Sequence, residues 1–324
     1  MMTRSNGRSS GFRNWLNILR IPNLAMIIIT QYLLGYGIIR PLLKLHQVEA
    51  PLGHLNFFML VMTTLLIAAA GYIINDHFDV NTDRKNKPGK NMLEGKISVR
   101  KALNAYYIIN AVAILLGFYL AYLAASFQLG LVFPAIIGLL WYYSSRYQRM
   151  PFWGNLIVAL LSAMVLLVIW LFEFYILLKE GADFVSVIRQ LGTINSFVWA
   201  YALFAFLLSL TREVLKDIQD VKGDMTSGYR TLPVIWGLKR ARVLAGGLII
   251  ISIILLAAAQ WILFSKGMDL ASWYLLIAVQ SLLIYLLYQL ARAKESDAYG
   301  FLSNMAKLIM LAGILSMELI YISI

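Results

Sequence analysis

Residues 75–83 read NDHFDVNTD and stand at the end of a long apolar run. The stretch places Asp76, Asp79 and Asp83 at offsets of three and seven residues. If the helix expected for the apolar run continues through the stretch, the three carboxylates fall within a sector of about 60° on one helix face. Because neighbouring anions repel each other, we expect a cation among them, and a divalent metal fits best.

A second stretch repeats this spacing. Residues 216–224 read KDIQDVKGD, so that Asp217, Asp220 and Asp224 follow another apolar run in the same DxxDxxxD pattern. One such pattern occurs at many solvated helix ends. Two copies, each followed by lysines and arginines, hold six of the sixteen acidic residues and predict a common metal site.

Composition identifies the class of protein. The 324 residues are 60% hydrophobic, with a mean hydropathy of +0.73, which favours a polytopic membrane protein over soluble domains. The net charge of +12 is carried by short connections between apolar runs, so we interpret it as topology determinants and phosphate ligands and expect no nucleic-acid partner. The absence of cysteine excludes disulfides and thiolate chemistry.

The fold expected from the apolar runs is an all-α bundle of about nine transmembrane helices. Residues 1–22 form a basic N-terminus, and the first apolar run is interpreted as a retained span because no small-residue cleavage site follows it. Residues 23–324 form one transmembrane domain, with acidic-motif loops at 75–101 and 212–241. The expected spans are 23–40, 55–76, 102–124, 128–145, 154–178, 194–215, 242–264, 271–291 and 300–323.

The distribution of lysine and arginine predicts the orientation. Alternate connections, beginning with the N-terminus, carry most of these residues. The positive-inside rule therefore places the N-terminus and both acidic loops in the cytoplasm and the C-terminus outside. Both clusters then lie at one membrane face, as a common site requires.

Two motifs resemble those of a known family. The pair NDxxDxxxD and DxxDxxxD, together with TREVLKDIQDVKGD and GYRTLPVIWG, is similar to the signature of the UbiA superfamily of intramembrane prenyltransferases. The loop DRKNKPGKNMLEGKIS follows the family in register. It departs from the pattern at Lys90, Asn91 and Glu94, where many members have an Arg-Pro pair and a small residue before the glycine.

The resemblance implies a Mg²⁺-dependent enzyme that transfers a polyprenyl group from its diphosphate to an acceptor at the cytoplasmic membrane face. The six aspartates would be catalytic, and together with Asn75 they would hold the metal. Basic side chains beside them would neutralise charge on the leaving pyrophosphate. The diphosphate ligands expected in this way are Asn75, Arg84, Lys90, Lys216, Lys222 and Arg230.

Aromatic residues are the expected wall around the cationic carbon that forms. Within WYYSSRYQRMPFWGN, a Tyr-Ser pair, a basic residue and a Gly-Asn pair resemble the family pattern, and Tyr142 and Tyr143 are the candidates for this wall. An interfacial aromatic belt is the alternative. The segment LRIPN, residues 19–23, resembles a short family motif, and Asn23 is expected either to line the substrate cavity or to cap a helix.

The acceptor stays open between two chemical classes. The loop KNKPGKNMLEGKIS, residues 85–98, resembles that of a bacterial branch grouped with geranylgeranylglyceryl phosphate prenyltransferases, which favours a geranylgeranyl donor and a glycerol-phosphate-type lipid acceptor. An aromatic quinone precursor of the 4-hydroxybenzoate or dihydroxynaphthoate type is the alternative. From another class, a cation-binding transporter would place its carboxylates near mid-membrane. Glu173 lies within an expected span, and we expect it to be paired structurally.

Overall fold

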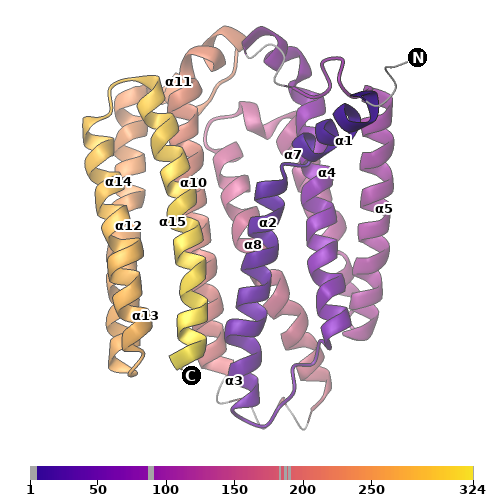
Figure 1. Ribbon diagram of the computed structural model, residues 1–324, viewed down its shortest axis with the longest axis vertical. Helices are drawn as coiled ribbons and strands as arrows, with labels where there is room; N and C mark the ends of the chain where they lie inside the picture. The colour runs from indigo at the N-terminus through magenta and orange to yellow at the C-terminus, as the bar shows by residue number, and fades with distance from the viewer. Residues whose placement is uncertain (1–5, 87–90, 182–183, 186–187, 189–190, 324) are drawn as a thin grey trace. The chain divides into compact units, whose positions relative to one another are not determined.

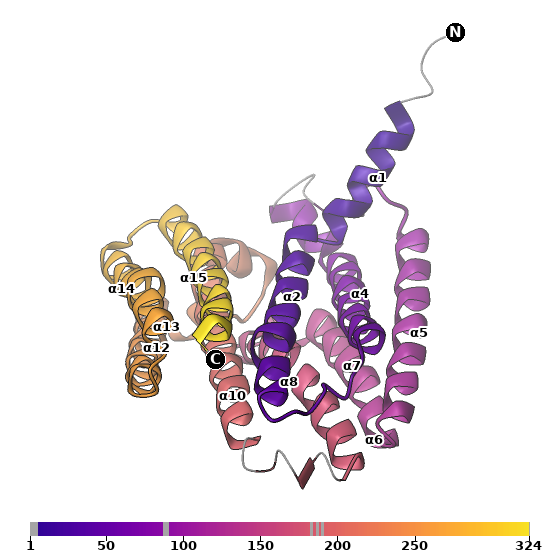
Figure 2. The ribbon, with the colours of Figure 1, turned by 60° about the horizontal axis from the view of Figure 1, so that its bottom comes forward.

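The computed structural model describes residues 6–86, 91–181, 184–185, 188 and 191–323. Every regular element named in these ranges is a helix, which confirms the expected all-α class (Figures 1 and 2). The α-helices are α1 (Asn6–Ile18), α2 (Ile21–Leu34), α3 (Arg40–Lys44), α4 (His54–Asn86), α5 (Val99–Leu123), α6 (Phe127–Gly130), α7 (Val132–Ser145), α8 (Trp153–Lys179), α10 (Leu191–Ser227), α11 (Leu232–Trp236), α12 (Leu238–Ser265), α13 (Asp269–Tyr274), α14 (Ser281–Arg292) and α15 (Ser296–Ser323). Two π-helical turns, η1 (Gly35–Ile39) and η3 (Leu275–Gln280), and one 3₁₀ turn, η2 (Tyr147–Arg149), connect some of them.

In the part of the chain that the structure describes, nine helical segments are long and apolar enough to cross a membrane, as the sequence predicts. An apolar run of about 20 residues spans the hydrocarbon core as a helix because only a helix satisfies its own backbone groups there. The chain is therefore an integral, multi-pass membrane protein. The segments are Ile21–Lys44, His54–Val80, Val99–Leu123, Phe127–Ser145, Trp153–Lys179, Leu191–Ser227, Leu238–Ser265, Asp269–Arg292 and Ser296–Ser323.

Two of these helices continue past their apolar runs. α4 extends to Asn86 and α10 to Ser227, so both acidic stretches are helical where the sequence analysis places loops. No proline interrupts either stretch, and α10 ends beside Gly228, whose φ of 73° is the left-handed conformation that commonly ends helices. The DxxDxxxD spacing therefore lies on a helix face in both copies.

The chain separates into two compact units. Unit 1 comprises residues 1–29 and 52–147, and unit 2 comprises residues 30–51 and 148–324. The first acidic stretch belongs to unit 1 and the second to unit 2. The organisation of residues 23–324 as a single domain stays a prediction.

In unit 1, α4 packs against α5 and α7. Small residues allow these helices to approach closely, which is typical of packing inside membranes. Gly71 lies against Leu140, and a Cβ atom at Gly117 would lie only 2.2 Å from the ring of Phe133. The contact at Gly71 packs α7 against α4 one turn before the first acidic stretch, and the contact at Gly117 packs α5 against α7.

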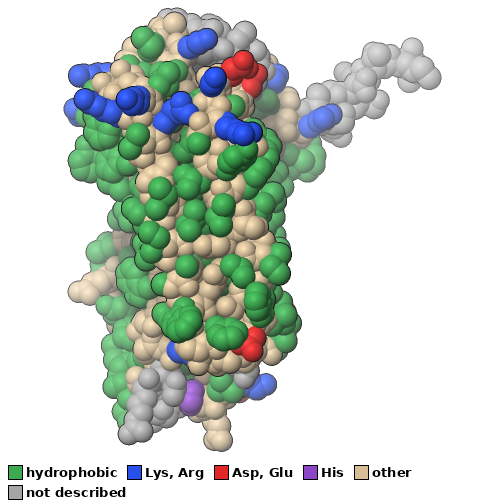
Figure 3. Space-filling model, turned by 90° about the vertical axis from the view of Figure 1, so that its left-hand side faces the viewer, with side chains coloured by type: hydrophobic (Ala, Val, Ile, Leu, Met, Phe, Trp, Pro, Cys, Tyr) green, Lys and Arg blue, Asp and Glu red, His purple; other side chains and the backbone are tan. Residues whose placement is uncertain are grey.

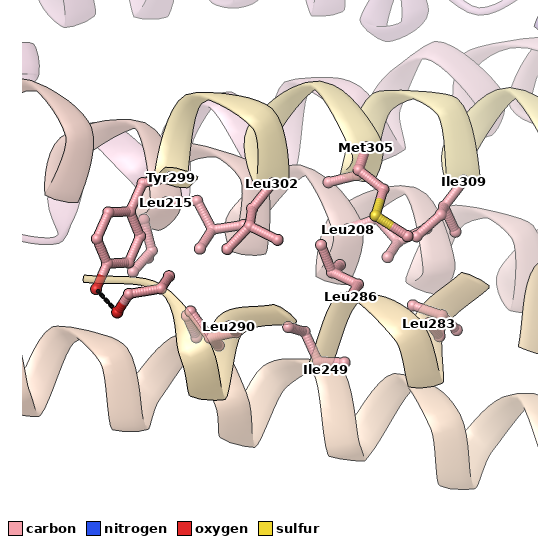
Figure 4. Close-up of a cluster of buried hydrophobic side chains, with 14 of the residues drawn as sticks. Leu208, Leu215, Ile249, Leu283, Leu286, Leu290, Tyr299, Leu302, Met305 and Ile309 are labelled. Atoms are coloured by element: carbon pink, nitrogen blue, oxygen red, sulfur yellow. Dashed lines mark hydrogen bonds between the residues drawn. The ribbon is translucent and has the colours of Figure 1, made fainter. Parts of the chain in front are cut away.

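In unit 2, α10, α12, α14 and α15 share an apolar core. Leu208 and Leu215 of α10 meet Leu302 and Met305 of α15, with Ile249 of α12 completing the layer (Figure 4). At the end of this core, Gly300 of α15 lies so close to α10 that an added Cβ atom would be 2.5 Å from the amide nitrogen of Gln219. Gln219 stands between Asp217 and Asp220, so α15 directly supports the second acidic stretch.

An ion pair is buried in the interior of unit 2. A guanidinium nitrogen of Arg40 lies 4.0 Å from a carboxylate oxygen of Glu173, whose side chain is 0% exposed. The guanidinium also lies over the ring of Tyr36 at 4.3 Å. The expected structural pairing of Glu173 is confirmed.

Candidate active site

The first acidic stretch is held on α4 in unit 1. Asn75, Asp76 and Asp79 are half-buried on the helix, and the amide of Asn75 donates to a carboxylate oxygen of Asp79 at 3.0 Å. These two residues are one helical turn apart, as the spacing predicts. Asp83 and Arg84 lie on the same helix. Their side chains lie outside the description, as does the whole of Lys90.

A cation from another part of unit 1 contacts this stretch. Arg20 lies between α1 and α2, and its Nη2 atom donates to Asp76 at 2.9 Å and to the amide oxygen of Asn75 at 3.4 Å. Its guanidinium carbon lies 5.0 Å from the centre of the Tyr72 ring. The φ angle of Arg20 is 52°, which is uncommon for a residue with a side chain. The structure thus adds Arg20 to the candidate site, with LRIPN as the sequence signal that contained it.

Asn23, the residue expected from that motif, occupies a different position. It is half-buried in the first turn of α2, and its backbone N–H donates to the carbonyl of Arg20 at 2.8 Å. Its expected contact with substrate stays a prediction.

The chain returns to the first acidic stretch at Asn91. The amide of Asn91 donates to the backbone carbonyl of Asp76 at 2.8 Å, while its oxygen accepts from the N–H of Leu93 at 2.9 Å. Asn91 is only 3% exposed. This side chain therefore holds the backbone at Asn91 beside that of Asp76, at a position where the sequence departs from the family pattern.

The second acidic stretch is held on α10 in unit 2. Asn155, buried in the first turn of α8, donates its amide to a carboxylate oxygen of Asp217 at 2.8 Å. The hydroxyl of Thr231 donates to Asp224 at 2.8 Å. Asp220 lies half-buried between them on the helix. Two of the three carboxylates are therefore oriented by buried polar side chains from other segments.

Four cations lie near the second acidic stretch or the end of α10. Lys216, Lys222 and Arg230 are exposed. The backbone N–H of Arg230 donates to the carbonyl of Arg149 at 3.1 Å, and the guanidinium of Arg149 lies over the Tyr229 ring at 5.1 Å. The structure thus brings Arg149, which is not among the diphosphate ligands expected from the sequence, to the end of α10. The expected phosphate contacts of Lys216, Lys222 and Arg230 stay predictions.

The expected aromatic wall begins next to the first acidic stretch. Trp141 of α7 meets Phe78 of α4 edge to face, with ring centres 6.0 Å apart, and Tyr142 meets Trp141 at 5.1 Å. Phe78 lies between Asp76 and Asp79 in the sequence. Within unit 1, Trp141 is therefore the ring in direct contact with the acidic helix, while Tyr142 is 54% exposed. The roles of Tyr142 and Tyr143 in binding a cationic carbon stay predictions.

The donor atoms of both stretches suit magnesium. Carboxylate and amide oxygens are hard ligands, and Mg²⁺ is usually held by one or two carboxylates together with water and substrate phosphates. Within the described ranges, no group of three or more His, Asp or Glu side chains is placed to hold a metal ion. The oxygen donors that fit are those of Asn75, Asp76 and Asp79 in unit 1 and of Asp217, Asp220 and Asp224 in unit 2.

Known proteins resemble the chain over most of its length. The curated relative from Methanosphaera stadtmanae, a digeranylgeranylglyceryl phosphate synthase, is 28% identical over 270 residues, which cover 82% of this chain and 89% of that protein. The synthase of the same name from Sulfurisphaera tokodaii is 33% identical over 202 residues, covering 62% of this chain and 64% of that protein.

Solved structures share the fold. A structure described as concerning digeranylgeranylglyceryl phosphate synthase in membranes superposes with a TM-score of 0.64 at 21% identity, covering 97% of this chain and 99% of that one. A UbiA homologue from Archaeoglobus fulgidus bound to DMAPP and Mg²⁺ superposes with a TM-score of 0.56 at 17% identity, covering 94% and 99%. The profile of the UbiA prenyltransferase family matches residues 43–308. With two acidic helix faces, nine candidate spans among the described residues and this match over most of its length, the chain belongs to the UbiA prenyltransferase family.

Proposed function

We propose that this prenyltransferase transfers a geranylgeranyl group from its diphosphate to a glycerol-phosphate-type lipid acceptor in a Mg²⁺-dependent reaction. The observation that carries the acceptor is the similarity over 82% of the chain to a digeranylgeranylglyceryl phosphate synthase. The repeated acidic helix face carries the diphosphate chemistry. The resemblance of the loop at residues 85–98 to geranylgeranylglyceryl phosphate prenyltransferases also supports this acceptor.

In this proposal both acidic stretches serve one diphosphate. Asn75, Asp76, Asp79 and Asp83 from α4 and Asp217, Asp220 and Asp224 from α10 hold the metal. When bound, Mg²⁺ supplies positive charge to the diphosphate oxygens and so favours departure of pyrophosphate. Asn155 and Thr231 support the proposal because each already orients one of these carboxylates.

The reaction exchanges one carbon–oxygen bond for another. The bond between the allylic carbon and the diphosphate breaks, an acceptor hydroxyl forms the new bond and loses its proton, and pyrophosphate leaves. The cations Arg20, Arg84, Lys90, Lys216, Lys222 and Arg230 neutralise the leaving charge. Aromatic rings beside the reacting carbon attract its positive charge by about 0.5–2 kcal/mol each, and they exclude water.

The proposed orientation follows the charge bias of the sequence. The N-terminus and the acidic ends of α4 and α10 face the cytoplasm, where the soluble pyrophosphate is released. The apolar prenyl tail lies among the spans and contacts membrane lipid. This geometry lets both lipid substrates stay in the membrane while their polar ends meet the carboxylates.

The acceptor is tested with purified protein and labelled geranylgeranyl diphosphate. The acceptors are a geranylgeranylated glycerol phosphate, 4-hydroxybenzoate and a dihydroxynaphthoate, each with Mg²⁺ or with a chelator. We expect labelled product from the glycerol phosphate lipid alone, its formation lost with chelator and restored by added Mg²⁺. A prenylated aromatic product without a lipid product would overturn the proposed acceptor.

The site is tested by removing one carboxylate from each stretch. The double variant Asp76→Ala and Asp217→Ala is expected to lose transfer to every acceptor. Asp269→Ala is the matched control, because Asp269 is exposed in the first turn of α13 and belongs to neither stretch. Activity that survives the double variant excludes the proposed metal site.

A further inference from the structure

A small recess lies where α14 and α15 meet in unit 2. Its volume is about 270 Å³, and Arg292, Lys294, Ala298, Phe301 and Leu302 are among the residues that line it. α14 ends at Arg292 and α15 begins at Ser296, so the recess lies at the end of two candidate membrane spans. None of its lining residues belongs to the acidic stretches.

The recess is lined by more positive than negative charge. Arg292 and Lys294 contribute two cations, and Glu295 contributes one carboxylate. The guanidinium of Arg292 lies over the Tyr288 ring at 4.4 Å, which limits its freedom before any ligand binds. Arg242 of α12 adds a third cation nearby, because it donates to the carbonyls of Leu290 and Ala291 at the end of α14. The site therefore favours an anion.

Below the recess, an apolar stripe follows α15. Phe301 lines the recess, and the exposed residues Leu308, Leu315 and Ile322 follow it at intervals of seven. Residues seven apart lie close to one helix face, so these four side chains, between 45% and 63% exposed, form a continuous stripe. In Figure 3, Lys and Arg gather at one end of the face that includes α12 and α14, while hydrophobic side chains cover its length.

The packing of unit 2 holds the recess in shape. The hydroxyl of Tyr299 donates to the carbonyl of Ala293 at 3.3 Å, and Leu290 and Leu302 pack in the core directly beneath (Figure 4). The hydroxyl of Ser296 donates to the carbonyl of Gln219 at 2.8 Å, which ties the start of α15 to α10. The recess is therefore part of a well-packed helix junction.

We propose that this recess binds the phosphate headgroup of an anionic membrane lipid, with one of its apolar chains along the part of the stripe nearest the recess, from Phe301 to Leu308. Basic pockets between membrane helices bind anionic headgroups in this way. The positive-inside rule accounts for cations at a span end, and an apolar outer face is general for membrane spans, but neither requires a recess that joins the two. A lipid satisfies both features with one molecule.

Lipid binding is measured by native mass spectrometry of the purified full-length protein with phosphatidylglycerol and with phosphatidylcholine. We expect phosphatidylglycerol to bind the wild type more tightly. The double variant Arg292→Gln and Lys294→Gln should bind it about 25-fold more weakly, from roughly fivefold per cation. Ala298→Phe, which fills the recess without changing its charge, should also weaken this binding.

The control removes the same charge from another helix. Arg100→Gln with Lys101→Gln changes two exposed cations in the first turn of α5 in unit 1 and should leave the binding unchanged. Equal loss in this control, unchanged binding in the Arg292 and Lys294 double variant, or equal binding of phosphatidylcholine each overturns the proposal. Inorganic phosphate that binds the recess as tightly as the lipid overturns it as well, because the stripe would then have no role.

Discussion

A hydrogen bond of 2.9 Å joins the guanidinium of Arg20 to the carboxylate of Asp76, although the two residues are 56 positions apart. Arg20 is 40% exposed and Asp76 is 13% exposed, so the carboxylate is the more deeply held partner. Arg20 also occupies a left-handed backbone conformation, which structures usually retain where a side chain must be aimed. A positive charge is thus fixed beside the first acidic stretch before any substrate binds.

We predict that Arg20→Gln lowers kcat/KM for the prenyl diphosphate by about 100-fold, since the loss of one preorganised donor to developing negative charge has effects of this order. Arg20→Lys should retain part of the activity because it keeps the charge without the planar donor geometry. Steady-state kinetics with varied diphosphate measures both. Arg13→Gln, an exposed cation on α1, is the control and should behave as wild type. Wild-type kinetics for Arg20→Gln would remove Arg20 from the site.

The contact between Asn155 and Asp217 leads to a second prediction. Asn155→Ala removes the buried donor to Asp217, and leaving a buried acceptor without its partner costs about 1–3 kcal/mol. We expect lower thermal stability and a higher Mg²⁺ concentration for half-maximal activity, because the carboxylate loses its orientation. Asn195→Ala is the matched control, since Asn195 accepts from the indole of Trp170 at 2.6 Å on the same two helices. It should lower stability without changing the Mg²⁺ requirement, and equal Mg²⁺ responses in the two variants would contradict the positioning role.

Sequence alone was sufficient for the spans and for the two acidic faces. The spans are predictable because each is a continuous apolar run, and the acidic faces because helical periodicity fixes which side chains align once the helix continues. The ends of α4 and α10 were harder to predict. Their polar residues after an apolar run are typical of a loop, yet both helices continue through them, and α10 ends only beside Gly228.

The contacts that orient the carboxylates could not be predicted from periodicity. Arg20, Asn91 and Thr231 reach their aspartates from other segments, so their roles depend on packing that no local pattern encodes. In the sequence, Arg20 and Asn155 lie inside short motifs that resemble those of the family, and Asn91 lies where the sequence departs from the family pattern. The sequence signal available for Asn91 is its departure from the family pattern within a basic loop.

Asn91 gives a third prediction. Asn91→Ala removes the donor to the Asp76 carbonyl and the acceptor for the Leu93 N–H, so the chain at Asn91 loses its side-chain contact with the first acidic stretch. We expect KM for the prenyl diphosphate to rise by about tenfold with a smaller change in kcat, since a loss of about 1.4 kcal/mol of binding corresponds to a factor of ten. Asn104→Ala, an exposed asparagine on α5, is the matched control. A fall in kcat alone would show that Asn91 acts on the chemical step and not on binding.

The buried pair Arg40 and Glu173 gives the last prediction, which concerns stability and not the site. Glu173→Leu leaves the Arg40 charge in the apolar interior of unit 2 without its carboxylate, and breaking a buried pair in this way costs about 3–5 kcal/mol. The double variant Arg40→Met and Glu173→Leu removes both charges and should recover most of that loss, because neither desolvated ion remains. Thermal unfolding in detergent compares Glu173→Leu and the double variant with the wild type. Glu180 is an exposed carboxylate just after α8, so Glu180→Leu is the control for adding an apolar side chain. A double variant no more stable than Glu173→Leu would show that the pair contributes through contacts other than its opposite charges.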